Sequence, residues 1–171
     1  MPLIVETGVG LADADSYISL VDARALAVKF GYALPSDDTA AEVALRQGAQ
    51  YVDLQEGCFG GSRFTATQAI AWPRTETANK FGFDIPSGTM PPQLASAQVA
   101  AAAEYGAGTD VRATNDGKSV ASEEVVGAVA VSYFNNGKTG GTVEITKALD
   151  ALKPLMINCQ GNGFAFRVGR S

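Results

Sequence analysis

The sequence predicts a mostly α-helical α+β fold, a compact bundle of about four helices with a β-hairpin and an extended C-terminal tail. Apolar residues recur at helical spacing in four segments of the chain. An Asn136-Gly137 pair follows a run of β-branched residues, which is typical of a hairpin turn. The chain has 171 residues and is 46% hydrophobic, so it can form a core without a metal or a disulfide. We expect one domain over residues 1–156 and a tail over residues 157–171.

The first two helices are predicted by their caps and their apolar stripes. Ser19 is a good N-cap for a helix over residues 20–30, and Gly31 is a typical stop. Ser36 is expected to cap a second helix that ends near residue 55, with acidic residues in its first turn. The apolar residues at helical spacing are Leu20, Ala23, Ala27 and Phe30 in the first helix and Ala41, Leu45, Gly48 and Val52 in the second.

A turn-rich segment over residues 56–90 contains a Trp-Pro-Arg motif. Pro73 restricts Trp72 to extended backbone, so the only tryptophan of the chain lies at a bend. Arg74 follows this bend and is suited to an interface ion pair or to a fork with a carboxylate. The alternative is that Trp72 lies in the core while Arg74 reaches towards water.

Two further helices are predicted in the second half of the chain. Pro91 and Pro92 are acceptable in the first turn of a helix, and Gly106 follows its last apolar position. A final helix is expected over residues 144–156, bent or shortened by Pro154. The apolar stripes are Leu94, Ala97, Ala101 and Tyr105 in the third helix and Ile145, Leu149, Leu152 and Met156 in the fourth.

The β-hairpin is expected over about residues 123–143, between these two helices. An alternating run up to Tyr133 supplies the first strand, the turn lies at Asn136-Gly137, and residues 139–143 supply the return strand. Lys138 and Thr139 then complete a sequence similar to the end of a phosphate-binding loop. The glycine that this motif requires is replaced by Ser132, so no nucleotide site is expected.

The absence of histidine from the chain excludes several kinds of catalytic and metal site. Ser-His-Asp and Cys-His nucleophile systems, histidine-containing zinc sites and histidine pH switches all need an imidazole. The acid pairs Asp13 with Asp15 and Asp37 with Asp38 fit turns and helix caps better than the two carboxylates of a hydrolase. We therefore expect no enzymatic activity, no catalytic residue, no cofactor and no bound metal.

The charge balance disfavours tight autonomous binding to DNA. The chain has 13 basic and 18 acidic residues, a net charge of −5, and an acidic body repels phosphates. Weak binding of single strands is a separate possibility, because cations lie beside aromatic residues that stack on bases. The same residues also fit a small apolar cluster under a loop. They are Arg63 with Phe64, and Lys80 with Phe81 and Phe83.

The two cysteines, Cys58 and Cys159, are far apart in the sequence and form no CxxC pair. Their expected state is therefore two reduced thiols in a cytosolic product. The N-terminus lacks the features of a signal peptide, and the charge-free residues 85–103 contain three prolines. We expect neither secretion nor a membrane span.

Six segments that together cover nearly the whole chain resemble one known family. They are Glu6-Thr7-Gly8 to Tyr17, Ala49-Gln50-Tyr51-Val52-Asp53, Gln68-Ala69-Ile70-Ala71-Trp72-Pro73-Arg74, Ile85-Pro86 with Pro91-Gln93-Leu94, Glu124-Val125 to Tyr133, and Ala151-Leu152-Lys153-Pro154-Leu155. In this order they resemble the tailed-bacteriophage head-to-tail adaptor proteins, the connector or neck proteins that often carry the label of DnaT-like single-stranded-DNA-binding proteins. The Trp-Pro-Arg box is the most specific element.

The resemblance implies a structural role in the virion. Such adaptors are made in the bacterial cytoplasm and form a ring, commonly of twelve copies, under the portal, which extends the DNA channel and joins the capsid to the tail. The implied partners are other copies of the chain, the portal protein, a stopper or tail-completion protein, and double-stranded DNA that passes without specific binding. No membrane is involved. Because the tail beyond Leu155 is not clearly helical, an extended docking arm is expected.

Nine residues are the candidates for partner binding. We expect Trp72 and Arg74 to fix the central loop. The hairpin tip should touch a neighbouring copy through Asn136, Gly137 and Lys138. The tail should dock on the portal through Phe164, Phe166, Arg167 and Arg170. The competing function is a DnaT-like single-stranded-DNA-binding protein, which predicts salt-sensitive binding of single strands.

Overall fold

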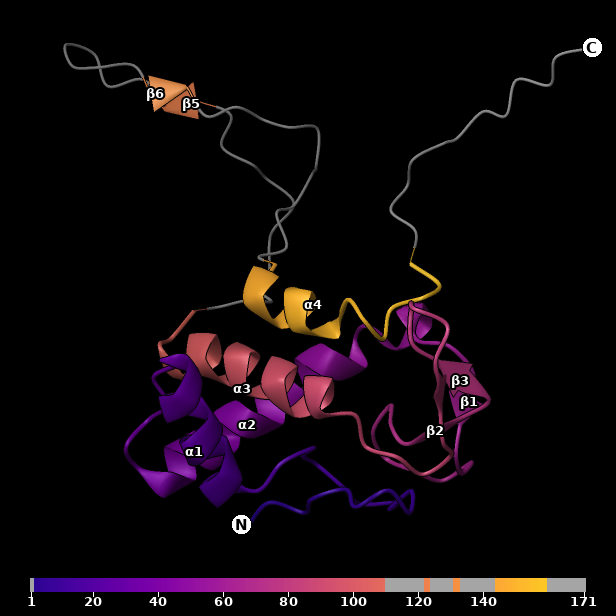
Figure 1. The fold of residues 1–171 in the computed structure, drawn as a ribbon. Coiled ribbons are helices and arrows are strands. Elements are labelled where there is room, and N and C mark those ends of the chain that lie inside the picture. Colours follow the sequence, from indigo (N-terminus) through magenta and orange to yellow (C-terminus); the bar gives the residue numbers. More distant parts are fainter. Residues whose placement is uncertain (1, 110–121, 124–130, 133–143, 160–171) are drawn as a thin grey trace, which may run out of the picture. The chain divides into compact units, whose positions relative to one another are not determined.

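The computed structural model describes residues 2–109, 122–123, 131–132 and 144–159 (Figure 1). By its internal contacts the chain divides into two compact units, Met1–Thr109 with Ile145–Ser171, and Asp110–Glu144. The described residues form four α-helices and three antiparallel pairs of short strands. This composition confirms the predicted mostly α-helical α+β class.

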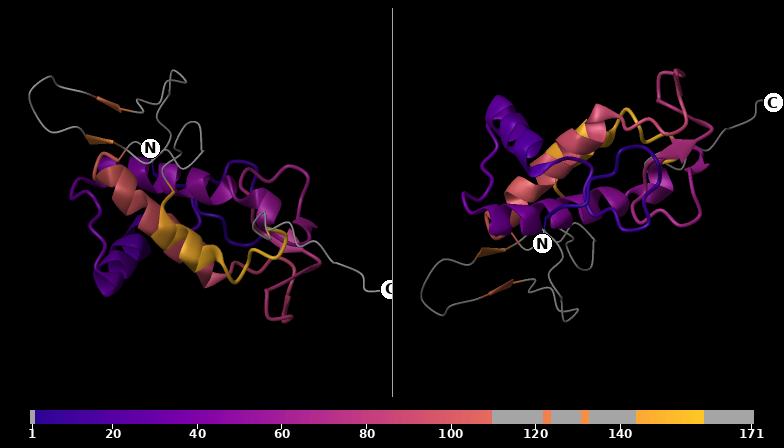
Figure 2. Two further views of the ribbon diagram at one scale, coloured as in Figure 1. Left: turned by 90° about the horizontal axis from the view of Figure 1, so that it is seen from above. Right: turned by 90° about the horizontal axis from the view of Figure 1, so that it is seen from below.

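Helix α3 (Pro92–Gly106) is the central element of the first unit. Helices α2 (Asp38–Asp53) and α4 (Thr146–Leu152) pack on different sides of α3 (Figures 1 and 2). Helix α1 (Leu20–Phe30) makes fewer contacts and packs against both α2 and α3. Many α3 residues are alanines, and small side chains let helices approach closely. The core cluster shared by α1, α2 and α3 consists of Ala23, Ala27, Ala44, Leu45, Val99 and Ala102.

The bounds of α1 agree with the prediction because both of its caps are local. Ser19 Oγ accepts a hydrogen bond from the backbone N–H of Asp22 at 3.1 Å. Gly31 ends the helix with φ 71°, in the left-handed region that glycine adopts at low cost. The inner face of α1 is made of the alanines Ala23 and Ala27.

Helix α2 begins one residue later than expected. Asp37, and not Ser36, is the N-cap, because its Oδ2 accepts from the backbone N–H of Ala40 at 2.8 Å. The predicted stripe is buried against α3. Gly48 marks the closest approach, since a Cβ there would lie 2.4 Å from the carbonyl oxygen of Gln98.

Helix α4 is shorter than predicted. It ends at Leu152, two residues before Pro154, whose ring cannot continue the hydrogen-bond ladder. Ile145, Ala148 and Leu152 are buried, and so is Leu155 beyond the helix. Within the described part of the chain, no helix is long and apolar enough to cross a membrane.

The segment between α2 and α3 contains a short 3-10 helix and two small hairpins. The 3-10 helix η1 spans Glu56–Cys58. Strand β1 (Ser62–Arg63) pairs with β2 (Arg74–Thr75), and β3 (Thr77–Ala78) pairs with β4 (Asp84–Ile85). The sequence analysis described this whole segment as turns, because strands of two residues carry no periodic signal.

In the second unit, the described strands are β5 (Ser122–Glu123) and β6 (Val131–Ser132), which pair antiparallel. The sequence analysis instead expected the run up to Tyr133 to pair with residues 139–143. The predicted turn residues Asn136, Gly137 and Lys138 lie outside the described residues.

The prediction of two reduced thiols is wrong, because Cys58 and Cys159 form a disulfide with their Cα atoms 4.7 Å apart. They are separated by 101 residues in the sequence, and neither lies in a motif that signals its partner. The contact arises because the chain returns to η1 after α4, where Met156 bridges to Phe59.

Candidate functional site

Arg74 is buried at the junction of the loops that connect α2 to the small hairpins, with 6% of its side chain exposed. Its Nε donates to the carbonyl of Gly60 at 2.6 Å and its Nη2 to the carbonyl of Gly61 at 2.9 Å. Nη1 donates to the carbonyl of Ala71 at 3.2 Å and lies 3.3 Å from Glu56 Oε1. One guanidinium therefore ties residues 56–61 to residues 71–74.

Glu56 connects this arginine to a second one. Arg63 binds the carboxylate in a bidentate manner, because its Nε donates to Oε1 and its Nη2 donates to Oε2, each at 2.7 Å. The hydrogen bonds from Arg63 hold the pKa of Glu56 below its ordinary value, and the same pairing raises the pKa of Arg63. We call Glu56, Arg63 and Arg74 the Arg74 cluster.

Trp72 fills the core beneath the Arg74 cluster. It is fully buried, meets Phe59 edge to face at 5.8 Å between ring centroids, and precedes Pro73 through a cis peptide bond. The side chain of Gln68 donates to the carbonyls of Ile70 and Pro73, both at 2.9 Å. Residues 68–74 therefore contribute their polar and aromatic side chains to the interior of the fold.

These positions decide between the two sequence-based interpretations of Trp72 and Arg74. The core alternative for Trp72 is confirmed, whereas Arg74 does not reach water, because three carbonyls and one carboxylate surround its guanidinium. The hydrogen bonds of Arg74 hold the central loop together, whereas the part of Trp72 and Arg74 in partner binding stays a prediction. Neither is exposed, so a partner at this place would contact the loops that they hold.

A buried pair formed by Tyr17 and Asp53 lies next to this box. The Tyr17 hydroxyl donates to Asp53 Oδ1, which also accepts from the backbone N–H of Ala71 at 3.0 Å. Burial raises the pKa of Asp53 from 3.8 to about 6, and burial together with Asp53 raises the pKa of Tyr17. The pair anchors the end of α2 to the Trp72 loop.

The raised pKa of Asp53 predicts that stability falls as the pH rises from about 4 to about 6. The folded protein binds this proton more tightly than the unfolded chain, so the ionised carboxylate is destabilising above its folded pKa. A shift of about two units corresponds to a loss on the order of 3 kcal/mol. The lowered pKa of Glu56 acts in the opposite direction, but only at more acidic pH.

Urea unfolding of the wild type and of Asp53→Asn between pH 4.5 and 7 measures this effect. Asparagine keeps the acceptor oxygen for Tyr17 and Ala71 and removes the titration. We expect a clear slope in the wild type and a flatter one in the variant. Equal slopes in the two proteins would contradict the prediction.

The backbone N–H groups of the glycine-rich segment 8–11 bind the carboxylate of Glu6. Glu6 is buried, and its Oε1 accepts from the backbone N–H groups of Gly8, Val9 and Gly10 at 2.8, 2.9 and 2.9 Å. Oε2 accepts from the N–H of Leu11 at 2.7 Å. The sequence analysis missed this loop, although an acid two residues before a Gly-x-Gly pair is its signal.

One member of each acid pair has a defined structural role, and only that of Asp37 is the helix cap that was expected. Asp15 accepts from the backbone N–H of Ile4 at 2.7 Å and pairs with Arg46 at 2.6 Å, and Asp37 caps α2. Among the described residues, no group of three or more histidine, cysteine, aspartate or glutamate side chains could hold a metal ion.

An exposed aromatic loop connects β3 to β4, and we call residues 79–83 the aromatic tip. Phe81 and Phe83 are 66% and 71% exposed, and the Lys80 ammonium lies 5.2 Å from the Phe81 ring centroid. Asn79 Oδ1 accepts from the backbone N–H groups of Phe81 and Phe83 at 3.0 and 3.1 Å. The N–H of Lys80 donates to the carbonyl of Pro154 at 2.8 Å, which holds the tip against the body. The loop thus presents two phenyl rings and one cation on a defined backbone.

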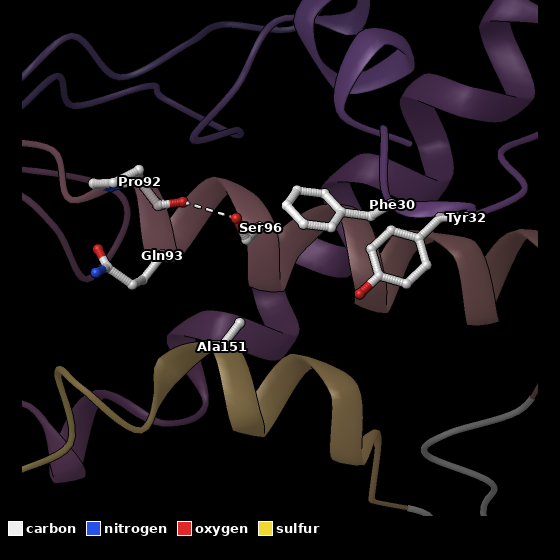
Figure 3. Close-up of a pocket in the computed structure, with 6 residues that line it drawn as sticks. All are labelled: Phe30, Tyr32, Pro92, Gln93, Ser96 and Ala151. Atoms are coloured by element: carbon white, nitrogen blue, oxygen red, sulfur yellow. Dashed lines mark hydrogen bonds between the residues drawn. The ribbon is translucent and has the colours of Figure 1, made fainter. Parts of the chain in front are cut away.

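A pocket with a volume of about 340 Å³ lies where the end of α1 meets α3 and α4. The close-up in Figure 3 shows the rings of Phe30 and Tyr32 beside each other, with Ala151 of α4 facing them across the hollow. The remaining lining residues are Pro92, Gln93 and Ser96, and Ser96 Oγ donates to the Pro92 carbonyl at 3.2 Å. This lining offers apolar contact and contains no carboxylate or cation.

The other candidate residues from the sequence analysis lie outside the described part of the chain. They are Asn136, Gly137, Lys138, Phe164, Phe166, Arg167 and Arg170. In the first cation–aromatic group, Arg63 is paired with Glu56, and Phe64 is 42% exposed. The second group is the aromatic tip, whose phenyl rings face solvent.

These features define a small, mostly helical protein whose exposed candidate binding surface is a fixed aromatic loop. The chain belongs to the family described as "Putative DnaT-like ssDNA binding protein", whose model matches residues 1–171. No curated protein and no solved structure gives a significant match. The family's description agrees with the single-stranded-DNA-binding alternative of the sequence analysis.

Proposed function

We propose that the protein is a structural subunit of a phage head-to-tail connector, without enzymatic activity. Copies of the chain form a ring under the portal in the virion neck, extend the DNA channel and join the capsid to a stopper or tail protein. The resemblance of six segments to head-to-tail adaptors supports this role. The observation that carries it is a pair of uncharged outer helix faces on an otherwise acidic body.

The first uncharged face belongs to α1, where two valines point outwards while Leu20 and Leu26 pack against the core. Val21 and Val28 are 77% and 83% exposed, with the exposed Ala25 between them. The inner face of the same helix holds only alanines at its fully buried positions. An outward valine stripe is unusual for a helix whose apolar face should meet the core, and it suits contact with another chain.

The second uncharged face runs along α2. Val43 and Leu54 are both 49% exposed, and the exposed positions between them are glutamines. Its residues are Ala40, Val43, Gln47, Gln50 and Leu54. Two different faces on one subunit permit the head-to-tail contacts that close a ring. Because neither face carries a charge, copies with a net charge of −5 can pack there without burying like charges.

The acidic balance also suits a channel through which DNA slides. A net charge of −5 disfavours adhesive contacts with phosphates. Double-stranded DNA would therefore pass through the lumen without specific binding.

Electron cryomicroscopy of the full-length protein mixed with its portal tests the connector function. We expect a ring on the portal for the wild type and for Thr67→Lys, and no ring for Val28→Lys or Val43→Lys. Thr67 is an exposed position outside both faces, so it controls for the added charge. All three variants should unfold within about 0.5 kcal/mol of the wild type, because they change surface residues. Rings that form equally well with Val28→Lys and Val43→Lys would exclude these faces, and an absence of rings with the wild type would overturn the proposal.

Single-stranded DNA binding is the second candidate, and the family's description supports it directly. The aromatic tip favours it, because Phe81 and Phe83 are exposed and Lys80 lies beside them. Bases stack on such rings largely independently of sequence, and one cation adds a contact to the phosphate backbone. The exposed Asp84 next to the tip weakens that contact.

The effect of the tip is measured by gel shift or fluorescence anisotropy with oligothymidine at two salt concentrations. If the second function holds, Phe81→Ala and Phe83→Ala each weaken binding by about 5- to 150-fold, since a stacked base contributes about 1–3 kcal/mol. Val21→Ala, an exposed apolar truncation elsewhere, should leave the affinity unchanged. A portal-bound ring together with no shift would support the connector function alone.

A further inference from the structure

The disulfide between Cys58 and Cys159 joins the end of η1 to the segment that follows α4. Hydrogen bonds hold the same two segments together beside the sulfur atoms. The backbone N–H groups of Ile157 and Asn158 both donate to the carbonyl of Cys58 at 3.0 Å. The side chain of Asn158 donates to the carbonyl of Phe59 at 2.9 Å. Three hydrogen bonds thus join the two segments in addition to the covalent bond.

The two cysteines differ in exposure. Cys58 is buried, with 9% of its surface exposed, whereas Cys159 is exposed. A small disulfide in solution can therefore reach Cys159, and Cys58 is positioned to react next. A buried thiol that waits beside an accessible one is suited to resolve a mixed disulfide.

We propose that Cys58 and Cys159 are a redox modification site, which reduced glutathione opens to two thiols and a small disulfide such as oxidised glutathione closes to the crosslink of the structure. The crosslink fixes the segment after α4 to η1. If the protein is a connector subunit, the crosslink closes when particles are released into oxidising surroundings. This timing rests on the proposed connector function, whereas the thiol–disulfide exchange itself is independent of it.

The reaction proceeds in two exchanges. The Cys159 thiolate attacks one sulfur of oxidised glutathione, forms a mixed disulfide and releases one glutathione thiolate. The Cys58 thiolate then attacks the Cys159 sulfur and releases the second glutathione thiolate. The protons of the two cysteines pass to the two released thiolates. Two protein thiols are thus oxidised to one disulfide, and one glutathione disulfide is reduced to two thiols.

Closing the crosslink acts on two parts of the structure. It fixes Cys159, which directly precedes residues 160–171. The predicted portal-docking residues lie in that segment. The crosslink also holds η1, whose first residue Glu56 belongs to the Arg74 cluster. Without the bond, the segment 156–159 depends on a few hydrogen bonds that open locally far more easily than the core.

The test uses the full-length protein equilibrated in buffers of reduced or oxidised glutathione. Alkylation followed by mass spectrometry should find two free thiols in the reducing buffer and one intramolecular crosslink in the oxidising buffer. Hydrogen exchange of residues 156–159 should slow at least about tenfold on oxidation, since local opening is then blocked covalently. The Tm should rise by about 5 °C or more, because the bond closes a long loop.

Cys159→Ser is the matched control, because it keeps the backbone hydrogen bonds at an exposed position and removes the crosslink. Its exchange and Tm should equal those of the reduced wild type in both buffers. The proposal is overturned if both thiols stay free in oxidised glutathione, if they pair between molecules, or if exchange of residues 156–159 is the same in the two states. Portal binding is not a readout, so this result is separate from that of the connector test.

Discussion

Replacing Arg74 by methionine is expected to destabilise the protein by about 3–5 kcal/mol, because three backbone carbonyls at a buried place lose their donor. The guanidinium satisfies the carbonyls of Gly60, Gly61 and Ala71, and methionine leaves all three without this donor. Each buried acceptor that loses its partner adds a desolvation cost. Methionine nearly matches the length of the side chain, so the loss reports on polar contacts more than on volume.

Chemical unfolding of the wild type, Arg74→Met and Arg74→Lys measures this loss. Lysine keeps the charge but cannot serve three carbonyls and a carboxylate as a planar fork does, so it should recover only part of the stability. Arg63→Met is the comparison at the rim of the same cluster, and we expect it to cost about 1 kcal/mol, because its ion pair is more exposed. The explanation fails if Arg74→Lys is as stable as the wild type.

Replacing Gln98 by leucine is expected to cost about 3 kcal/mol, because a fully buried amide serves three polar groups at once. Its Nε2 donates to Ser16 Oγ at 2.7 Å and to the carbonyl of Leu45 at 2.9 Å. Its Oε1 accepts from the backbone N–H of Tyr17 at 2.8 Å. The amide thus joins α3 to α2 and to the segment that precedes α1.

Thermal and urea unfolding of Gln98→Leu and Gln98→Glu separates shape from hydrogen bonding. Glutamate keeps the acceptor for Tyr17 but loses the donors and buries an acid, so its stability should fall further as the pH rises above the ordinary glutamate pKa of about 4.3. Gln93→Leu on the same helix is a control at a half-buried position and should change stability by less than about 1 kcal/mol. A wild-type Tm for Gln98→Leu would mean that the network contributes nothing net.

The parts of the fold that could be predicted are those with local causes. The bounds of α1 follow from Ser19 and Gly31, which lie within one turn of the helix ends that they satisfy. The cap of α2 was misplaced by one residue because Ser36 and Asp37 are both good N-caps, and only the backbone geometry selects between them. The stripe of α3 was identified, but the role of Gln98 within it was not.

The parts that could not be predicted depend on partners without a sequence signature. Arg74 binds mainly to backbone carbonyls. Because every residue has a backbone carbonyl, the sequence does not indicate which ones accept from Arg74. The fork between Glu56 and Arg63 and the disulfide at Cys58 depend on how distant loops return to η1. The aromatic tip was noticed from its composition, whereas its exposure follows from the turn built on Asn79.

The central place of α3 has a consequence for synthesis of the chain. One side of α3 is covered by α2, which the ribosome makes earlier, but another side is covered by α4, which is made only after residues 107–145. Ile145, just before α4, is also tied to α2, because its N–H donates to the Tyr51 hydroxyl at 2.8 Å. A nascent chain that ends before residue 145 therefore leaves alanine-rich apolar surface uncovered, where it can associate with other incomplete chains. The core of this protein closes only after α4 has left the ribosome.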